Sequence, residues 1–467
     1  MFSTADTIVA VATPAGRGGL GVIRLSGPDA PAIACRLMRR PSLEPRHATF
    51  GHISDAPDPR APHIDQVVAT WFAAPHSYTS EEVVEISAHG SPPLLLRIVE
   101  LAMDAGARLA EPGEFTLRAY LNGRIDLVQA EAVRDLIDAV TPLQARVAMD
   151  QLEGTLTTAI ARIDRMLFDL AARLEASLDF PDEGFHFITR DETVAELDRA
   201  AGAVSVLVRE GRAGRVLREG TLVAIVGPTN AGKSSLFNTL VGSARAIVTD
   251  VPGTTRDLLS ETVDLEGLAV TLVDTAGVRD TVDPIEAEGV RRAEQTSAVA
   301  ALTLLVLDGS QEWTAAALSR SRLPRSPDPV DGGPARRRLV VANKCDLPRA
   351  WDAAALAAFG VQPAEVVEVS ATRGDGLAVL RQRIARAVTD RDHWRDPPAV
   401  SNVRHLQLLD RAGGALDRAR EALSAGATEE LVLVELSDAR HALEAITGRR
   451  TPDDVLHHIF GRFCVGK

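Results

Sequence analysis

The segment LVAIVGPTNAGKSSLF, residues 222–237, decides the fold of the middle of this chain. An apolar run leads into G-x-x-x-x-G-K-S, and a helical run follows. In this context the glycines let backbone N–H groups converge on phosphate oxygens, the lysine reaches the outer phosphates and the serine ligates magnesium. The sequence therefore predicts a nucleotide site with bound Mg²⁺. The expected contacts are Asn230, Ala231, Gly232, Lys233, Ser234 and Ser235.

Further motifs end later apolar runs, in the order that a guanine-nucleotide site requires. D-T-A-G at 274–277 places a carboxylate beside the magnesium shell and a glycine N–H near the terminal phosphate. In N-K-C-D at 343–346, Asp346 can accept from the N1 and N2 donors that guanine has and adenine lacks. The expected contacts are Asp274, Thr275, Ala276, Gly277, Asn343, Lys344, Asp346, and Ser370 and Ala371, which follow the next run and can close over the base.

The spacing of apolar residues predicts a multidomain α/β protein. Runs such as VTLVD, LTLLVLD and LVVAN are almost continuously apolar, as a parallel sheet with helices on both faces requires. Leu152, Leu156, Ile160, Ile163, Leu167, Leu170 and Leu174 recur at intervals of three or four and predict one long helix. Helical patterns return after Val388, so we expect a mostly parallel GTPase domain inserted in a helical domain, after an N-terminal α+β domain. The expected boundaries are 1–122, 123–215, 216–387 and 388–467.

Composition narrows the functional class. With 45% hydrophobic and 25% charged residues and no long apolar run, the sequence predicts a soluble globular protein without membrane spans. No signal peptide is recognisable at the start, which favours the cytoplasm. The cysteines are too far apart for a zinc site. A net charge of −13 provides no global attraction for nucleic acid. Only three of the 51 basic residues are lysines, Lys233, Lys344 and Lys467, which singles these positions out.

The motifs resemble the translation-factor-like P-loop GTPases, and their details resemble the MnmE (TrmE) family of tRNA-modification GTPases. G-T-T-R-D at 253–257 is similar to the family's switch motif, in which Thr255 would complete the magnesium site. Val278 stands where Ras-like enzymes keep a water-orienting glutamine. The resemblance gives that catalytic role to Glu286. Solvated switch charges nearby, which are the alternatives, are Asp280, Asp283 and Glu288.

The resemblance also implies a potassium ion beside the phosphates. Asn230 is similar to the residue that family members use for this ion, and Thr249, Val251 and Thr254 would supply other oxygens. The expected nucleotide contacts also include Thr249, Asp250, Val251, Thr254 and Thr255. No arginine finger is evident, and the cation would supply the transition-state charge that such a finger provides, worth roughly 10³–10⁵ in rate. We therefore expect potassium-stimulated hydrolysis linked to pairing of two G domains.

The N-terminal region resembles the family's folate-binding and dimerisation domain. The similar segments are TIVAVATPAGRGGLGVIRLSG at 7–27, YTSEEVVE at 78–85 and GEFTLRA at 113–119 with the run on to Asp126. The resemblance implies that Arg24, Glu81 and Arg124 contact 5-formyl-tetrahydrofolate or a related folate. Composition alone favours ordinary surface charges. Gly16–Gly21 formally matches a dinucleotide fingerprint, but a β-run follows it, so a glycine hairpin is the better interpretation.

The tail FCVGK, residues 463–467, resembles the family's C-terminal C-[ILV]-G-K motif, which reaches the folate pocket. That resemblance implies a part for Cys464 in the modification chemistry and for Lys467 in folate binding. A frayed chain end is the alternative. Lys467 is a poor final residue for a prenylation box.

As a whole, the resemblance implies a homodimer that works with a flavin-dependent MnmG (GidA)-type partner in a heterotetramer. That complex would add a carboxymethylaminomethyl or aminomethyl group to C5 of the wobble uridine of certain tRNAs, with a tetrahydrofolate one-carbon unit. A GTPase for ribosome assembly and a stand-alone GTPase are the rival interpretations. The first usually appends an RNA-binding domain, and none is evident in this sequence.

Overall fold

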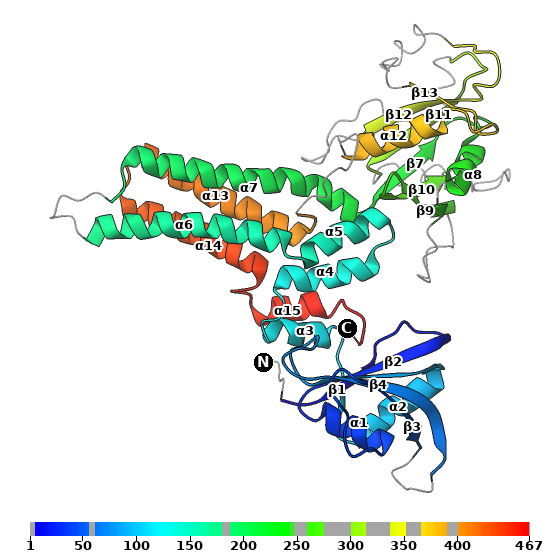
Figure 1. Cartoon of the computed structure of the whole chain (residues 1–467). Helices are drawn as coiled ribbons and strands as arrows, with labels where there is room; N and C mark the ends of the chain where they lie inside the picture. Colours follow the sequence, from blue (N-terminus) through cyan, green and yellow to red (C-terminus); the bar gives the residue numbers. More distant parts are fainter. Residues whose placement is uncertain are drawn as a thin grey trace, which may run out of the picture. The chain divides into compact units, whose positions relative to one another are not determined.

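The chain forms two compact units (Figure 1). The computed structural model describes residues 5–55, 61–179, 187–243, 245–246, 259–274, 300–313, 337–351, 366–389 and 400–466. Unit 1 consists of Met1–Arg134, Gln151–Ile188 and Ala422–Lys467, and unit 2 of Asp135–Asp150 and Thr189–Glu421. Each unit therefore combines segments that are far apart in the sequence.

Unit 1 contains a six-stranded sheet with the strand order β3-β4-β5-β2-β1-β6. Its strand pairs are antiparallel, except that β1 and β6 run parallel. Apolar side chains on one face pack against helices α1 (Ala30–Met38) and α2 (Pro92–Asp104) to form a core. The strands are β1 (Ile8–Val11), β2 (Gly18–Ser26), β3 (Ala48–Ser54), β4 (His63–Phe72), β5 (Val83–Gly90) and β6 (Arg108–Leu109).

The glycine-rich segment Gly16–Gly21 overlaps the start of β2 and lies in the connection between two antiparallel strands, because the Ala12 amide donates to the Val22 carbonyl oxygen at 2.7 Å and β1 pairs with β2. The hairpin interpretation of Gly16–Gly21 is confirmed. Gly51 lies within β3, and a Cβ there would lie 2.5 Å from Met38 Cε, so α1 packs closely on this strand.

The helical part of unit 1 corrects one prediction. Helix α5 (Pro142–Leu152) ends where the long helix was expected to begin, and α6 (Thr155–Asp179) starts after Gly154, whose φ is +89°. Leu152 therefore does not belong to α6, because a glycine in the left-handed conformation ends the preceding helix. The other expected positions, Leu156 to Leu174, are buried in α6.

Helix α6 packs against α14 (Glu429–Thr447) within unit 1. Arg440 connects the two helices, since its Nε donates to Asp164 Oδ1 at 2.8 Å and its guanidinium lies 5.0 Å from the Phe168 ring. The remaining helices of this unit are α3 (Glu114–Leu121), α4 (Leu127–Asp138), which extends past Arg134, and α15 (Asp453–Phe460).

Unit 2 contains a seven-stranded sheet with the order β13-β12-β11-β7-β10-β9-β8. The central pairs are parallel, and only the β10–β9 and β9–β8 pairs are antiparallel. This mostly parallel sheet confirms the expected fold class. The strands are β7 (Thr221–Val226), β8 (Arg245–Ala246), β9 (Leu259–Leu265), β10 (Leu268–Asp274), β11 (Leu302–Asp308), β12 (Arg337–Asn343) and β13 (Val366–Glu368).

Both faces of this sheet are covered in the described part of the chain. Helices α8 (Lys233–Ser243) and α12 (Leu377–Thr389) pack into the larger apolar core. On the opposite face Trp313 and Trp351 are buried against strands β7, β11 and β12. Residues 314–336, which precede β12, lie outside the described residues.

Two long helices complete unit 2. Helix α7 (Arg190–Glu219) begins with a capping box between Thr189 and Glu192. Helix α13 (Val403–Ser424), most of which lies in this unit, carries the buried leucines Leu406, Leu409, Leu416 and Leu423. Gly211 of α7 allows close packing, because a Cβ there would lie 2.5 Å from Leu406 Cδ2. None of the described helices has a stretch long and apolar enough to cross a bilayer.

Candidate functional site

The phosphate loop of unit 2 depends on glycines that no other residue could replace without strain. Gly227 has φ +148°, and a Cβ there would lie 2.1 Å from the Val306 carbonyl oxygen. Gly232 has φ +89°, and its Cβ would lie 2.2 Å from Asn343 Nδ2. Asn230 also adopts a positive φ, of +62°. The loop is thus packed tightly against β11 and against the end of β12, which brings its backbone close to the motif there.

Lys233 stands at the first position of α8 and is only 7% exposed. Its Nζ donates to the Pro228 carbonyl oxygen at 2.7 Å, across the loop. Desolvation lowers the pKa of Lys233, and the negative charge of Asp274 partly opposes this shift. A buried ammonium at a helix N-terminus is a strong attractant for phosphate oxygens.

Ser234 and Asp274 meet where the magnesium ion is expected. The Ser234 hydroxyl donates to Asp274 Oδ2 at 2.7 Å, and the carboxylate is fully buried at the end of β10. A hydroxyl and a carboxylate in contact are hard oxygen donors of the kind that Mg²⁺ prefers. The described residues include no cluster of three or more His, Cys, Asp or Glu side chains able to hold a metal. Ser234 and Asp274 are therefore the described residues whose chemistry fits a magnesium ion.

Asn343 connects the phosphate loop to the base-binding motifs. Its Nδ2 donates to the Ala231 carbonyl oxygen at 3.0 Å, and its Oδ1 accepts from the Ala371 amide at 3.1 Å. The side chain is 2% exposed, so these partners fix it completely. Thr239 of α8 adds a further hydrogen bond to the Ala371 carbonyl oxygen at 2.9 Å. Residues predicted to bind phosphate and base therefore form one hydrogen-bonded assembly.

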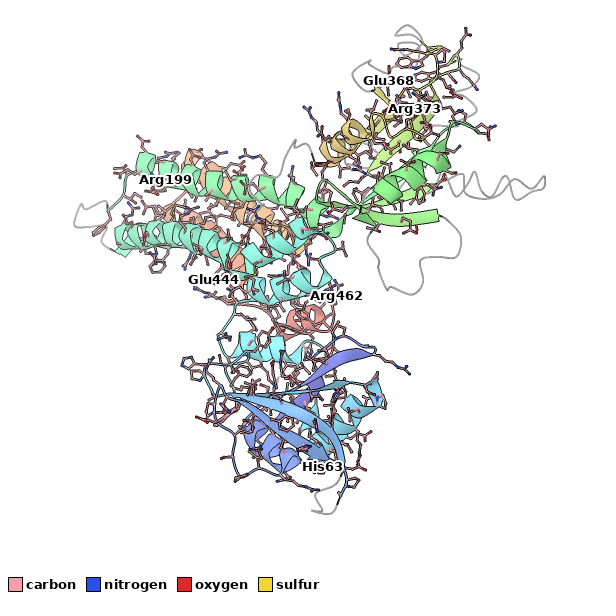
Figure 2. The ribbon with its side chains drawn as sticks, turned by 45° about the vertical axis from the view of Figure 1, so that its right-hand side comes forward. His63, Arg199, Glu368, Arg373, Glu444 and Arg462 are labelled. Carbon is pink, nitrogen blue, oxygen red and sulfur yellow. The ribbon has the colours of Figure 1, made fainter. Side chains whose placement is uncertain are left out.

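Asp346 lies where a guanine-reading carboxylate is expected. Its Oδ1 accepts from the Ser370 hydroxyl at 2.7 Å, and this hydrogen bond lowers the pKa of Asp346. The Ser370 hydroxyl also accepts from the Arg373 amide at 3.2 Å. Figure 2 labels Glu368, the last residue of β13, and Arg373, which follows it in the chain. The carboxylate is thus ionised and oriented, as an acceptor for two purine N–H groups must be.

Several predicted residues cannot be placed. The positions outside the described part of the chain are Thr249, Asp250, Val251, Thr254, Thr255, Thr275, Ala276, Gly277, Glu286 and Lys467. These include the expected catalytic glutamate, the switch threonine and all but one of the expected potassium ligands. Asn230, the remaining potassium ligand, lies in the phosphate loop beside Ala231.

In unit 1 the folate candidates Arg24 and Arg124 lie near Tyr78, which shares a turn with the third candidate, Glu81. The Arg24 guanidinium forms two hydrogen bonds to Glu85 Oε1, at 2.9 and 2.8 Å, and lies 5.3 Å from the centre of the Tyr78 ring. Burial raises the pKa of Tyr78, although a hydrogen bond with Thr116 and the positive charges of Arg24 and Arg124 partly oppose the shift. Arg24 and Arg124 are therefore both near this phenol.

Glu81 is held by residues that the sequence-based prediction did not single out. Its Oε2 accepts from the Ser26 hydroxyl at 2.7 Å and lies 3.3 Å from Arg118 Nη1. Arg118, only 1% exposed, also donates to Asp6 and to Glu114. A cation, a carboxylate and an aromatic ring side by side are suitable partners for a folate, which carries carboxylates, a pterin edge and flat rings.

Arg118 stands inside GEFTLRA, the segment on which the family resemblance rests. One feature of the sequence could have pointed to Arg118 as a partner of Glu114: the two are four residues apart, an interval at which side chains on one helix face meet. Its partners Asp6 and Glu81 are distant in sequence, so no local pattern could identify them.

The C-terminal tail packs against other parts of unit 1, so the interpretation as a frayed end is wrong for residues 463–466. Val465 forms an antiparallel bridge with Pro112, and the Gly113 amide donates to the Cys464 carbonyl oxygen at 3.3 Å. Gly466 has φ +94°, and a Cβ there would lie 2.2 Å from the Val11 carbonyl oxygen. Cys464 itself is a free, exposed thiol.

Comparisons with known proteins show the family of this chain. The family model "MnmE helical domain" matches residues 127–464, and the model "GTP-binding protein TrmE N-terminus" matches residues 7–124. A tRNA modification GTPase MnmE from Koribacter versatilis is 44% identical over 467 residues, with 99% of each chain covered. The chain belongs to the MnmE family. Another MnmE, from Aquifex aeolicus, is 39% identical over 464 residues, covering 99% of this chain and 100% of its own.

Among solved structures, the G domain of the FeoB iron transporter from T. maritima is 23% identical, with a TM-score of 0.25. The match covers 36% of this chain and 98% of the FeoB G-domain chain. The Era protein from Aquifex aeolicus bound to GDP and AlF4⁻ is 22% identical with a TM-score of 0.27, covering 42% and 66%. As a member of the MnmE family with the phosphate loop and base motifs described above, the chain is an enzyme that hydrolyses GTP to GDP and phosphate.

Proposed function

We propose that this MnmE-family chain is the GTPase component of tRNA wobble-uridine modification. With a flavin-dependent MnmG (GidA)-type partner, it adds a carboxymethylaminomethyl or aminomethyl group to C5 of the wobble uridine of certain tRNAs. The observation that carries the proposal is the 44% identity, over 99% of both chains, to a relative named tRNA modification GTPase. A match of this extent includes the N-terminal unit and the tail as well as the GTPase motifs.

For the nucleotide, the proposal assigns each part of GTP to residues of unit 2. Asn230–Ser235 surround the phosphates, Lys233 neutralises the outer ones and Asp346 reads guanine, with Lys344, Ser370 and Ala371 around the base. Thr249–Val251, Thr254, Thr255 and Thr275–Gly277 approach the phosphates from the switch segments. The proximity of Ser234 to Asp274, at 2.7 Å, supports a magnesium site completed by Thr255. Bound magnesium would neutralise charge that develops on the phosphate oxygens.

For hydrolysis, Glu286 orients the attacking water, and potassium held by Asn230, Thr249, Val251 and Thr254 supplies positive charge beside the phosphates. The left-handed conformation of Asn230 supports this role for the loop, because it turns the residue out of the regular backbone path. Hydrolysis rates measured in potassium and in sodium at equal ionic strength test the cation. We expect a rate at least tenfold higher in potassium, and equal rates would contradict the assignment.

For the one-carbon unit, the proposal places 5-formyl-tetrahydrofolate or a related folate beside Arg24, Glu81 and Arg124, with Lys467 and Cys464 of the tail. The support is geometric: Glu81 is fixed by Ser26 and Arg118, and Gly466 is fitted closely against Val11. The folate would supply the one-carbon unit. The residues would bind it and orient the reacting end toward the tail. The flavin comes from the partner protein.

The assembly proposed is a homodimer that joins the flavin protein in a heterotetramer in the cytoplasm, where tRNA is available. Mass spectrometry of wobble nucleosides tests the whole function. Cells that lack the gene should lose the C5 substituent from a subset of tRNAs, and the wild-type gene should restore it. If Cys464→Ser restored the modification as well as the wild-type gene does, the proposed chemical role of Cys464 would be wrong. Unchanged nucleosides in the deletion strain would favour the rival role in ribosome assembly.

A further inference from the structure

An ion pair joins the guanine motif to the neighbouring strand. Lys344 Nζ donates to Asp308 Oδ2 at 2.6 Å. Asp308 is the last residue of β11, and it lies opposite Asn343, the last residue of β12. Its side chain is 10% exposed, compared with 33% for Lys344. The carboxylate therefore reaches the lysine from a sheltered position within the sheet edge.

The Asp308 carboxylate is itself held in one orientation. Its Oδ1 accepts from the Ser310 amide at 3.0 Å and from the Ser310 hydroxyl at 2.6 Å, while Oδ2 faces Lys344. Burial alone raises the pKa of Asp308, but the hydrogen bonds from Lys344 and Ser310 outweigh it, so the pKa lies below its ordinary value. Asp308 thus presents a fixed negative charge to one ammonium.

The backbone around this pair is held by other contacts. The Gly309 amide donates to the Asn343 carbonyl oxygen at 2.7 Å, and the Ala350 amide donates to the Gly309 carbonyl oxygen at 3.0 Å. Trp313 Nε1 donates to the Asp308 carbonyl oxygen at 2.8 Å, and the Trp313 and Trp351 rings stack with centroids 4.5 Å apart. Loss of the ion pair should therefore release the Lys344 side chain without releasing the two loops.

A lysine has a flexible four-carbon stem, and its order depends on what holds the ammonium. Lys344 also has a left-handed backbone, with φ +66°. We infer that Asp308 is a positioning residue of the base site: it holds the Lys344 ammonium so that the lysine stem is ordered before the purine arrives. The inference rests on the proposed assignment of Lys344 and Asp346 to guanine. Without Asp308, the lysine side chain would have to become ordered when the nucleotide binds, and that entropy cost would weaken nucleotide binding.

A double-mutant cycle on the full chain tests this role, with a fluorescent GDP analogue as the probe. Asp308→Asn removes the charge and Lys344→Met removes the ammonium while keeping the stem. We expect Asp308→Asn to weaken GDP binding roughly tenfold in the wild-type background and less than twofold in the Lys344→Met background. In turnover the variant should raise KM for GTP and leave kcat within about twofold.

Two controls make the outcomes decisive. Glu368→Gln removes an exposed carboxylate of β13 that pairs with Arg349 at 3.1 Å, and should leave GDP affinity unchanged. Near-UV circular dichroism of the Trp313–Trp351 pair should be the same in all variants. An equal loss of affinity in both backgrounds, or no loss in either, would overturn the positioning role.

Failure of the base assignment would look different. Asp346→Asn replaces an acceptor for the guanine 2-amino group with an amide that can donate to the 2-oxo group of xanthine. If Asp346→Asn does not shift preference from GDP to XDP, the proposed base site is wrong. If Asp346→Asn does shift the preference to XDP, but the effects of Asp308→Asn and Lys344→Met are additive, only the inference on Asp308 is wrong.

Discussion

Asn343 donates from its side-chain amide to the Ala231 carbonyl oxygen at 3.0 Å, which ties the base motif to the phosphate loop. Replacement by aspartate keeps the shape but sets a carboxylate oxygen against that carbonyl. We expect Asn343→Asp to weaken both GTP and GDP binding at least 100-fold, because a repulsive contact and a lost donor are buried together. Isothermal titration measures this. Asn238→Asp, on the exposed face of α8, is the matched control. Similar affinities for the two variants would contradict the connecting role of Asn343.

Gly232 and Gly242 form a pair that separates phosphate-loop geometry from helix propensity. A methyl group on Gly232, where φ is +89°, would lie 2.2 Å from Asn343 Nδ2. A methyl group on Gly242 in α8 would meet no neighbouring side chain or segment within 4 Å. We expect Gly232→Ala to abolish GTP hydrolysis. Gly242→Ala should keep full activity and stabilise the protein by about 0.5–1 kcal/mol, because alanine is the better helix former. Steady-state hydrolysis and thermal unfolding of both variants decide. Substantial GTPase activity in Gly232→Ala would show that the loop tolerates the methyl group.

Gly466 tests whether the docked tail matters for modification. A Cβ there would contact the Val11 carbonyl oxygen at 2.2 Å, whereas Gly426 has an equally left-handed backbone, with φ +79°, and no atom within 4 Å. Gly466→Ala should displace the tail and reduce wobble modification at least tenfold in a complementation assay, because reacting groups lose their alignment when displaced by about 1 Å. Gly426→Ala should cost only backbone strain and complement fully. Equal complementation by the two variants would separate tail docking from function.

Glu114 gives unit 1 a stability that depends on pH. Burial raises the pKa of Glu114, but hydrogen bonds from Arg108, the Glu111 amide and Arg118 outweigh it, so the folded-state pKa lies below the ordinary 4.5. A lowered carboxylate pKa stabilises the fold above pH 4.5, and that stabilisation is lost as the pH falls through the folded value. We expect Glu114→Gln to cost about 3 kcal/mol at pH 7, since it leaves Arg118 buried with less compensation.

Thermal unfolding of the whole chain between pH 7 and pH 3 measures this difference, which should shrink below pH 4.5. Glu100→Gln is the control, because Glu100 is 61% exposed in its pair with Arg97 and should have no measurable effect. A destabilisation by Glu114→Gln that stays constant down to pH 3 would mean that the charge of Glu114 is not what stabilises unit 1.

The sequence predicted the phosphate loop and the base motif because each is a short segment that carries its own chemistry. Lys233, Ser234 and Asp346 could be identified without knowing the packing, since strand–loop–helix context fixes where such side chains point. The structure confirms the mostly parallel sheet around them. The roles of the individual site residues stay predictions.

Residues that hold those side chains could not be predicted in the same way. Asp308 meets Lys344 from a separate strand 36 positions away, and Arg118 meets Asp6 across 112 positions. Such pairs depend on strand register and helix docking, which periodicity does not determine. The misplaced start of α6 has a related cause: leucine spacing continues through Gly154, although the backbone turns there.

The C-terminal segment of unit 1 completes an apolar cluster that begins near the N-terminal sheet. Leu117 and Leu127 share an apolar cluster with Phe460 and Phe463, and the Tyr120 hydroxyl donates to the Gly448 carbonyl oxygen. At roughly 5–20 residues per second, these partners leave the ribosome some 20 to 70 seconds after the surface they cover. In that interval the nascent chain exposes the apolar surface around Leu117 and Leu127. A chaperone that binds during translation could cover this surface.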